Sequence, residues 1–322
     1  MQKLPRIALT GATGFVGKAL LPELVRQAAS AAALARPLKG RALLPSPGLT
    51  WVPGDLETNS ALETLSADAN VMIHLAGVTK AKDAQKFHRV NAEQAARLAG
   101  IARQAGVGHF VHVSSLTAIR PDVSAYARSK ADGERLVEDA AGDMPLTIIR
   151  APAILGPGDE ATVQVFSMLA RGILAVPGGA AGRFRFSIMD VLDLSKFILH
   201  LAMSPPAPRQ TLTPAGHLDV SWDGIAASAS RVLGRPVRQV RLAPGLMRSA
   251  GYLSDIAGKL SSKPQVFSGG KVRELLSGDW IAEAAVSEAI PLDQTLARCL
   301  APFLTSARQT RAGGRETHRS EA

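Results

Sequence analysis

Short β-type runs alternate with longer helical patterns along the first 150 residues of the chain. The β-type runs cover residues 6–10 (RIALT), 71–77 (VMIHLAG), 109–115 (HFVHVSS) and 146–152 (LTIIRAP). Parallel strands need long crossover connections, so this alternation predicts a parallel sheet with helices on both faces. The expected fold class is α/β, with a doubly wound parallel sheet.

A glycine-rich turn joins the first strand to the first helix. Gly11, Gly14 and Gly17 lie in LTGATGFVG, with a spacing of Gly-x-x-Gly-x-x-Gly. Glycine permits a tight turn there and lets backbone N–H groups approach a pyrophosphate, whose charge the helix N-terminus favours. We therefore expect a Rossmann-type dinucleotide-binding domain over residues 1–150. The Pro- and Gly-richer residues 151–305 are expected to form a smaller, mainly substrate-binding lobe, partly interleaved with the first domain.

Composition limits the location and the partners. The single cysteine, Cys299, excludes an internal disulfide, and no apolar run approaches the roughly 18 residues that a membrane helix needs. The start of the chain leads into a strand pattern rather than a signal region, so we expect a cytoplasmic protein with no membrane partner. The net charge of +10 is scattered, with few aromatic residues, and we expect no nucleic-acid partner. Residues 306–322 are predicted to form a disordered basic tail.

Tyr126 is one of two tyrosines in the chain and precedes Lys130 by four positions. Residues four apart share one face of a helix, and no proline interrupts the helical pattern before Pro145. A nearby cation favours the phenolate, so this pair predicts acid/base chemistry nearer neutral pH. The alternative is an amphipathic surface helix with a packed tyrosine and a solvated lysine.

An ordered set of motifs resembles the extended branch of the short-chain dehydrogenase/reductase superfamily, the NAD-dependent epimerase/dehydratase family. Each motif is weak alone, but their common order is specific, and the resemblance runs from about residue 5 to about residue 300. The motifs are TGATGFVG (10–17), GDL (54–56), HLAG (74–77), VSS (113–115), Tyr126 with Lys130, and RAPAILGPGD (150–159).

This resemblance implies roles for individual residues. Ser115 is expected to bind the substrate oxygen, Tyr126 to transfer the proton, and Lys130 to hold the ribose and support the phenolate. Counting back from Ala118 favours Ser115 over Ser114, and Thr117 is kept in reserve. The alternative for Ser115 is a structural role, in which its hydroxyl only forms a hydrogen bond with backbone groups at the end of the strand. The implied cofactor contacts are Gly11, Thr13, Gly14, Phe15, Val16, Gly17, Arg36, Asp55, Leu56, Leu75, Ala76, Gly77, Tyr126, Lys130, Pro152 and Ile154.

Departures from the family pattern narrow the chemistry. Leu116 and Thr117 stand where family dehydratases carry an Asp-Glu pair. That pair supplies the acid and the base that eliminate water. Ala153 and Leu155 replace the Asn and Tyr common in nucleotide-sugar enzymes. We therefore expect an oxidoreductase that reduces a carbonyl group of a small molecule, or oxidises an alcohol. A nucleotide-sugar epimerase is the first alternative, and a non-catalytic dinucleotide-binding assembly or sensor protein is the second.

Arg36 bears on the choice of dinucleotide. It lies about 20 residues beyond the glycine turn, where NAD enzymes carry an acidic residue for the ribose hydroxyl. No Asp or Glu occurs between Glu23 and Asp55, and Lys39 and Arg41 follow closely. A guanidinium binds a 2′-phosphate, so NADP is expected and NAD is the alternative. A solvated basic loop is the competing explanation for these residues.

The remaining expectations are structural. His74 is assigned to packing, and His109 and His112 are three apart in a strand, on opposite faces, so no metal site is expected. Asp193 is expected to cap a helix, and Trp280 to anchor packing after a short helix within residues 269–280. By family resemblance, the helix that carries Tyr126 is expected to take part in a homodimer.

Overall fold

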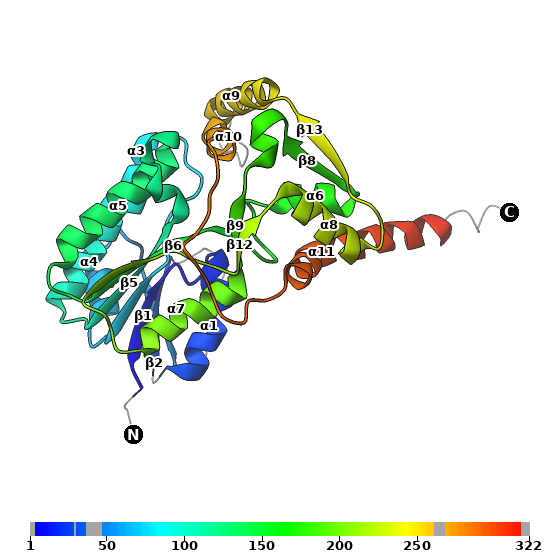
Figure 1. Cartoon of the computed structure of the whole chain (residues 1–322). Coiled ribbons are helices and arrows are strands. Elements are labelled where there is room, and N and C mark those ends of the chain that lie inside the picture. The colour runs from blue at the N-terminus through cyan, green and yellow to red at the C-terminus, as the bar shows by residue number, and fades with distance from the viewer. Residues whose placement is uncertain (1–3, 29, 37–46, 261–267, 317–322) are drawn as a thin grey trace.

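The central sheet has seven parallel strands in the order β10-β6-β5-β4-β1-β2-β3 (Figure 1). The computed structural model describes residues 4–28, 30–36, 47–260 and 268–316. All four residues of β4 are buried, as expected for a strand covered on both faces. The predicted doubly wound α/β fold is confirmed. The strands are β1 Arg6–Thr10, β2 Ser30–Ala35, β3 Leu49–Pro53, β4 Val71–His74, β5 His109–Ser115, β6 Leu146–Ala151 and β10 Arg209–Leu212.

Two layers of helices cover this sheet. One apolar cluster joins the sheet to α2, α4 and α5, and a second joins its other face to α1 and α7. Fully buried Phe110 and Leu20 belong to these two clusters respectively, so the sheet separates two cores. The helices of the two layers and their connections are α1 Phe15–Gln27, α2 Asn59–Ser66, α3 Ala84–His88, α4 Gln94–Gln104, α5 Ala125–Ala141 and α7 Val191–Met203.

The second lobe has its own core, built from α6, α8, α11 and the strands beside them. Helix α7 and strand β10 come after residue 151 but join the first domain, so the two parts are interleaved in the chain. Helices α9 and α10 pack together at the outer end of the lobe (Figure 1). The elements of the lobe are β7 Ala153–Leu155, α6 Val163–Ala170, β8 Ile173–Pro177, β9 Phe186–Asp190, β11 Pro214–Ala215, β12 His217–Val220, α8 Trp222–Leu233, β13 Arg238–Leu242, α9 Pro244–Leu260, α10 Gly269–Leu276, β14 Ala284–Ala285 and α11 Leu292–Glu316.

The cap of α7 differs from the prediction. Asp190, not Asp193, is the N-cap, and its carboxylate accepts a hydrogen bond from the Leu192 N–H at 2.9 Å. The helix starts directly after β9 ends, so the last strand residue is already in the cap position. Asp193 lies in the first turn and accepts from the Ile290 N–H at 2.8 Å, which ties α7 to a later segment.

The end of the chain also differs from the sequence expectation. Residues 306–316, which were expected to be disordered, continue helix α11 to Glu316. The segment extends a helix whose first part is packed in the lobe, and its Ala, Arg and Gln residues favour helix whereas Gly313 and Gly314 disfavour it. Residues 317–322 lie outside the described part. None of the described helices is long and apolar enough to cross a membrane.

Candidate active site at the carboxyl ends of the strands

The glycine turn between β1 and α1 is closely packed. Gly11 has a φ of +78°, and a Cβ there would lie 2.7 Å from the backbone nitrogen of Ala76. A Cβ on Gly17 would lie 2.1 Å from the carbonyl oxygen of Gly11. Both positions therefore require glycine, one for its conformation and both for the close approach of backbone.

The N-terminus of α1 fits a pyrophosphate. Its N-cap is Gly14, no side chain caps it within the described residues, and its first turn holds no acidic residue. Thr13 and Gly14 are exposed, while Phe15 and Val16 are half-buried beside them. The free N–H groups and the positive end of the helix dipole are the groups that bind phosphate oxygens.

The turn after β4 lies next to the glycine turn. The side chains of Thr10 and His74 share a hydrogen bond of 2.6 Å, which joins the ends of β1 and β4. Leu75 and Ala76 follow, half-buried, and Gly77 is exposed. These backbone groups therefore border the same opening as Gly11 and Gly14.

The histidines near this turn have packing roles. His74 is buried and stacks on His112, with ring centroids 5.3 Å apart. Burial, with a smaller effect of Lys130, lowers the pKa of His74 to about 3, so it is neutral at physiological pH. His109 lies on the opposite face of β5, within hydrogen-bond distance of Thr147 (3.0 Å). The described residues contain no cluster of potential metal ligands.

Asn91 is a positioning residue that the sequence reasoning missed. It lies in a π-helical turn, Arg89–Glu93, before α4. Its amide accepts from the Val78 N–H at 2.8 Å and donates to the Val78 carbonyl and to Ser129. It thus fastens the segment after Gly77 to helix α5. A π-turn is a common sign of a functional position, but it cannot be read from residue types alone.

The ends of β2 and β3 lie together at the edge of the sheet where adenosine binding is expected. Ala35 pairs with Pro53, so Arg36 and Gly54 follow side by side, and Arg36 is exposed. The Asp55 carboxylate accepts from the Glu57 N–H and the Thr58 hydroxyl, both at 3.0 Å. Leu56 is buried in the core, and its carbonyl oxygen accepts a hydrogen bond from the Arg97 guanidinium. Lys39 and Arg41 lie outside the described residues.

Ser115 and Tyr126 meet at the carboxyl end of β5. The hydroxyl of Ser115 accepts from the Thr117 hydroxyl at 3.0 Å, and it lies close enough to the Tyr126 phenol to act on the pKa of that phenol. Ser114 points to the other side, where it donates to the buried Glu134 carboxylate. The structure therefore brings together Ser115, Thr117 and Tyr126 and leaves Ser114 out.

Lys130 lies one turn along α5 from Tyr126, but its ammonium group is directed at the strand. It donates to the Val113 carbonyl oxygen at 3.0 Å and is buried. Burial lowers the pKa of Lys130 to about 8, against an opposing effect of Glu134. Glu134 is itself held by Arg150, with a closest contact of 2.7 Å. The expected direct support of the phenol by Lys130 is thus not what the structure shows.

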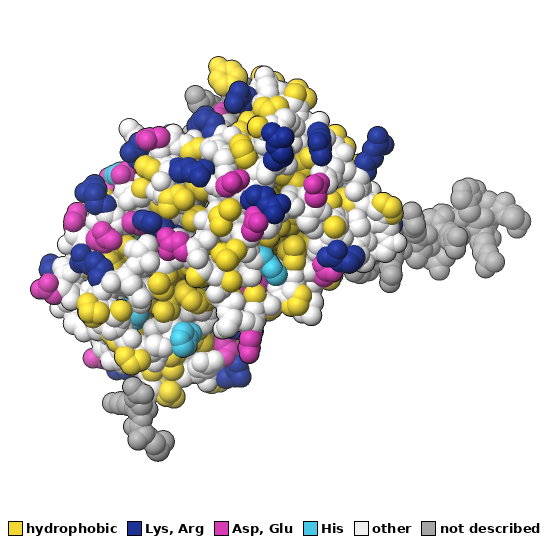
Figure 2. Space-filling model, in the orientation of Figure 1, with side chains coloured by type: hydrophobic (Ala, Val, Ile, Leu, Met, Phe, Trp, Pro, Cys, Tyr) yellow, Lys and Arg dark blue, Asp and Glu magenta, His cyan; other side chains and the backbone are white. Residues whose placement is uncertain are grey.

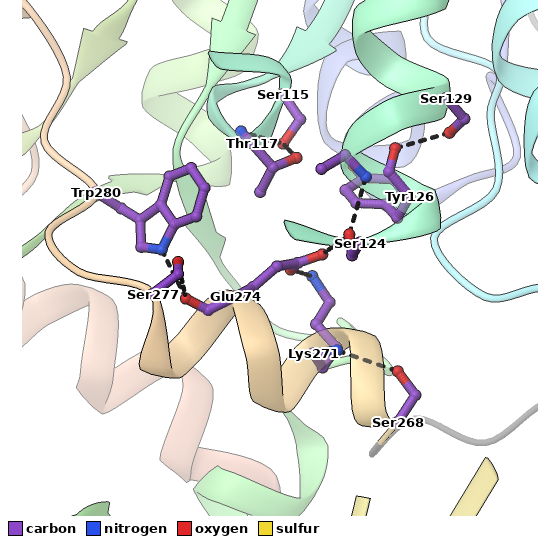
Figure 3. A network of polar contacts seen from close by, with 11 residues as sticks. Ser115, Thr117, Ser124, Tyr126, Ser129, Ser268, Lys271, Glu274, Ser277 and Trp280 are labelled. Carbon is purple, nitrogen blue, oxygen red and sulfur yellow. Dashed lines mark hydrogen bonds and ion pairs between the residues drawn. The ribbon is translucent and has the colours of Figure 1, made fainter. Parts of the chain in front are cut away.

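The cation beside the phenol is Lys271, from α10 of the second lobe. Its Nζ lies 5.1 Å from the centroid of the Tyr126 ring, and the edge of Phe87 packs on the same ring at 5.9 Å. Lys271 donates to Glu274 at 2.7 Å, and Glu274 accepts from the Ser124 hydroxyl at 2.5 Å (Figure 3). Ser124 is the N-cap of α5, two residues before Tyr126. Sequence reasoning missed this network, because only the three-dimensional fold brings α10 to α5.

Opposing effects act on the Tyr126 phenol. Burial raises its pKa above the ordinary value, while Lys271 and the Ser115 hydroxyl act to lower it. Burial also acts to lower the pKa of Lys271, but Glu274 and Tyr126 together raise it. The phenol is therefore protonated at neutral pH, with a charged ammonium beside it, which suits a proton donor.

Pro152 and Ile154 lie just beyond β6. Pro152 is buried, and half-buried Ile154 packs against the core cluster that includes α1 and α7. A cavity of about 300 Å³ lies elsewhere, at the amino ends of the strands, where Asn70 and Gly108 line it. The reactive side chains all gather at the opposite, carboxyl ends, where open α/β sheets bind ligands.

Comparison with known proteins agrees with this geometry. Residues 7–210 match the model of the NAD-dependent epimerase/dehydratase family. A ceramide reductase of Caulobacter vibrioides is 36% identical over 288 residues, which cover 88% of this chain and 89% of the relative. A UDP-glucose 4-epimerase of Vibrio cholerae is 25% identical, covering 82% and 88%.

A solved structure of an enzyme of Bordetella bronchiseptica in complex with NAD⁺ has the same fold. Its TM-score is 0.64 at 17% identity, over 93% of this chain and 98% of that one. The fold, the glycine turn and the family match agree, so the chain belongs to the NAD-dependent epimerase/dehydratase family and is an NAD(P)-dependent oxidoreductase of the extended short-chain dehydrogenase type.

Proposed function

We propose that this enzyme reduces a ketone group of a long-chain lipid to an alcohol, with NADPH as the reductant. The observation that carries the proposal is the meeting of Ser115 and Tyr126 beside the glycine turn, with Lys271 over the phenol ring. Two hydroxyl groups directed at one point can hold a carbonyl oxygen and protonate it.

The residues divide the work as follows. Ser115 donates a hydrogen bond to the ketone oxygen, and Tyr126 donates its proton to that oxygen as negative charge develops. The nicotinamide, when bound, supplies the hydride to the carbonyl carbon. Lys271 stabilises the resulting phenolate, and the family resemblance assigns Lys130 to the nicotinamide ribose. The balance is ketone plus NADPH plus a proton, giving alcohol plus NADP⁺.

The substrate class rests on the relative and on the residues near the site. The reductase from Caulobacter vibrioides, whose name refers to ceramide, matches over most of both chains. Ala153 is exposed at the start of β7, and it lacks the amide with which family members contact a sugar nucleotide. Without that amide, the site lacks one of the polar contacts that would orient a sugar nucleotide.

NADPH is proposed over NADH because of Arg36. It is exposed directly after β2, at the edge where the adenosine ribose binds in this fold. A guanidinium there favours a 2′-phosphate. A homodimer and a cytoplasmic location stay predictions.

An epimerase remains the second candidate, favoured by the relative from Vibrio cholerae. The two are separated by a turnover assay with purified enzyme, NADPH and either a long-chain 3-keto-ceramide or UDP-glucose. We expect NADPH to be consumed with the keto-lipid, in a reaction that Tyr126→Phe abolishes. Isomerisation of UDP-glucose without net NADPH consumption would establish the epimerase instead.

A further inference from the structure

Helix α9 presents an apolar stripe to solvent. Leu246 and Leu253 are 60% and 63% exposed, and Ala250 lies between them on the same helix face. Tyr252, on a neighbouring side of the same helix, is 67% exposed. Buried Met247 and Gly251 lie on the side of α9 that packs against the protein. Folded proteins rarely expose two leucines and a tyrosine on one helix, so we expect the exposed side of α9 to bind a partner.

The surroundings of this stripe are basic. Residues 235–260 hold five Lys or Arg and one acidic residue, Asp255. Asp255 is turned inward, where it accepts from the Gly269 N–H at 3.1 Å. Figure 2 shows hydrophobic and basic side chains mixed over the upper part of the molecule, where Figure 1 places α9 and β13.

Three arginines of β13 and α9 are exposed: Arg238 and Arg241 on the strand that leads into α9, and Arg248 on α9, on the far side of its exposed surface from Leu246. None of them forms an ion pair with another residue in the part of the chain that the structure describes. An apolar stripe together with these guanidinium groups is complementary to a surface that has anionic groups on the outside and an apolar interior.

We propose that α9 docks this enzyme on the surface of an anionic lipid bilayer. The leucines and Tyr252 enter the boundary between headgroups and acyl chains, while the arginines contact lipid phosphates. A second copy of this chain is the poorer occupant, because a symmetric contact would place the same arginines against each other. The docking is peripheral, since none of the described helices could cross a bilayer, and it departs from the expectation of no membrane partner.

The position of α9 links this surface to the reaction. Helix α9 packs on α10, and α10 carries Lys271 to the Tyr126 ring. A lipid leaving the bilayer at α9 would therefore enter next to the groups proposed to reduce it. The docking itself rests on the exposed residues alone and does not depend on the proposed reaction.

The test is cosedimentation of the full-length protein with vesicles of phosphatidylcholine, with and without phosphatidylglycerol, in the absence of dinucleotide and ketone. We expect binding to the anionic vesicles that weakens with added salt. The double variant Leu246→Glu/Leu253→Glu should bind about tenfold or more weakly. Leu4→Glu is the matched control, because Leu4 is 51% exposed and lies near the opposite end of the molecule.

Unchanged thermal unfolding of the double variant shows that it folds, and Arg248→Glu supplies a second, single-residue test of the charge. No binding to anionic vesicles, or equal losses in the double variant and in Leu4→Glu, would overturn the proposal. A concentration-dependent dimer that the double variant disrupts, with no vesicle binding, would assign the face to a second copy. Because no substrate is present, failure here leaves the reductase proposal standing.

Discussion

The dinucleotide-binding domain and the second lobe contribute to the site in different ways. The first domain places Ser115 at the end of β5, Tyr126 near the start of α5 and the glycine turn after β1, with β4 between the two strands. The second lobe reaches the same point with a single short helix, α10, which brings Lys271 and Glu274. The proposed reacting groups therefore belong to the dinucleotide-binding domain, while the charge beside the phenol comes from the second lobe.

The largest effect is expected from a substitution in the dinucleotide-binding domain. Tyr126→Phe removes the proton donor, so kcat should fall by about 10²-fold or more, while NADPH still binds. The measurement is steady-state turnover with fluorescence titration of the dinucleotide. Tyr252→Phe, at the chain's other tyrosine, is the control and should keep its activity. Near-normal turnover of Tyr126→Phe would place the proton donor elsewhere.

Dinucleotide choice tests the edge of the first domain. Arg36→Asp replaces the proposed partner of the 2′-phosphate by a carboxylate, which repels that phosphate. The preference for NADPH over NADH should therefore fall by roughly 1–3 kcal/mol. Titration of both dinucleotides into wild type and variant measures this. Arg171→Asp, at an exposed arginine of the second lobe, should leave the preference unchanged. An unaltered preference in Arg36→Asp would remove Arg36 from the cofactor site.

Lys271→Met tests the contribution of the second lobe. Without the ammonium group, the effect of burial raises the pKa of Tyr126 further. The loss of activity at alkaline pH should therefore occur at a higher pH than in the wild type. Turnover at neutral pH should drop roughly threefold to tenfold, because a weaker acid protonates the ketone oxygen more slowly. The pH profile of kcat/KM measures both effects.

Lys271→Arg should restore the profile, and Lys82→Met, at an exposed lysine, should not alter it. A Lys271→Met profile that matches the wild type would show that the phenol is tuned within the first domain alone.

The smallest effect is on stability. The pKa of Lys130 is about 8 in the fold, below its ordinary 10.5. Between these values the unfolded chain binds more protons, so this group destabilises the fold at pH 7, and the penalty fades as pH rises toward 10. Lys130→Met should therefore increase the free energy of unfolding at pH 7, by on the order of 1 kcal/mol.

Urea denaturation at pH 7 and pH 10 measures this difference, which should shrink at the higher pH. A variant destabilised equally at both values would show that the bond to the Val113 carbonyl outweighs the cost of the buried charge.

The parts of the fold that were predicted from the sequence are those set by local sequence patterns. Strands β1 and β5 and helix α5 follow from hydrophobic periodicity and from the glycine turn, and they lie where the sequence places them. The direction of the Lys130 side chain does not follow from its spacing, because the Val113 carbonyl competes for the ammonium. The contact between Lys271 and Tyr126 depends on the path of the second lobe, which carries no motif. The cap at Asp190 was missed because β9 and α7 join without a loop.

The most direct test of the proposed reaction follows a labelled hydride. Enzyme is incubated with a long-chain keto-ceramide and NADPH that carries deuterium at the transferable position, and the products are analysed by mass spectrometry. We predict one deuterium on the carbinol carbon of the alcohol, with one NADPH consumed for each alcohol formed. No labelled alcohol from the keto-lipid, together with isomerisation of UDP-glucose at constant NADPH, would contradict the reductase.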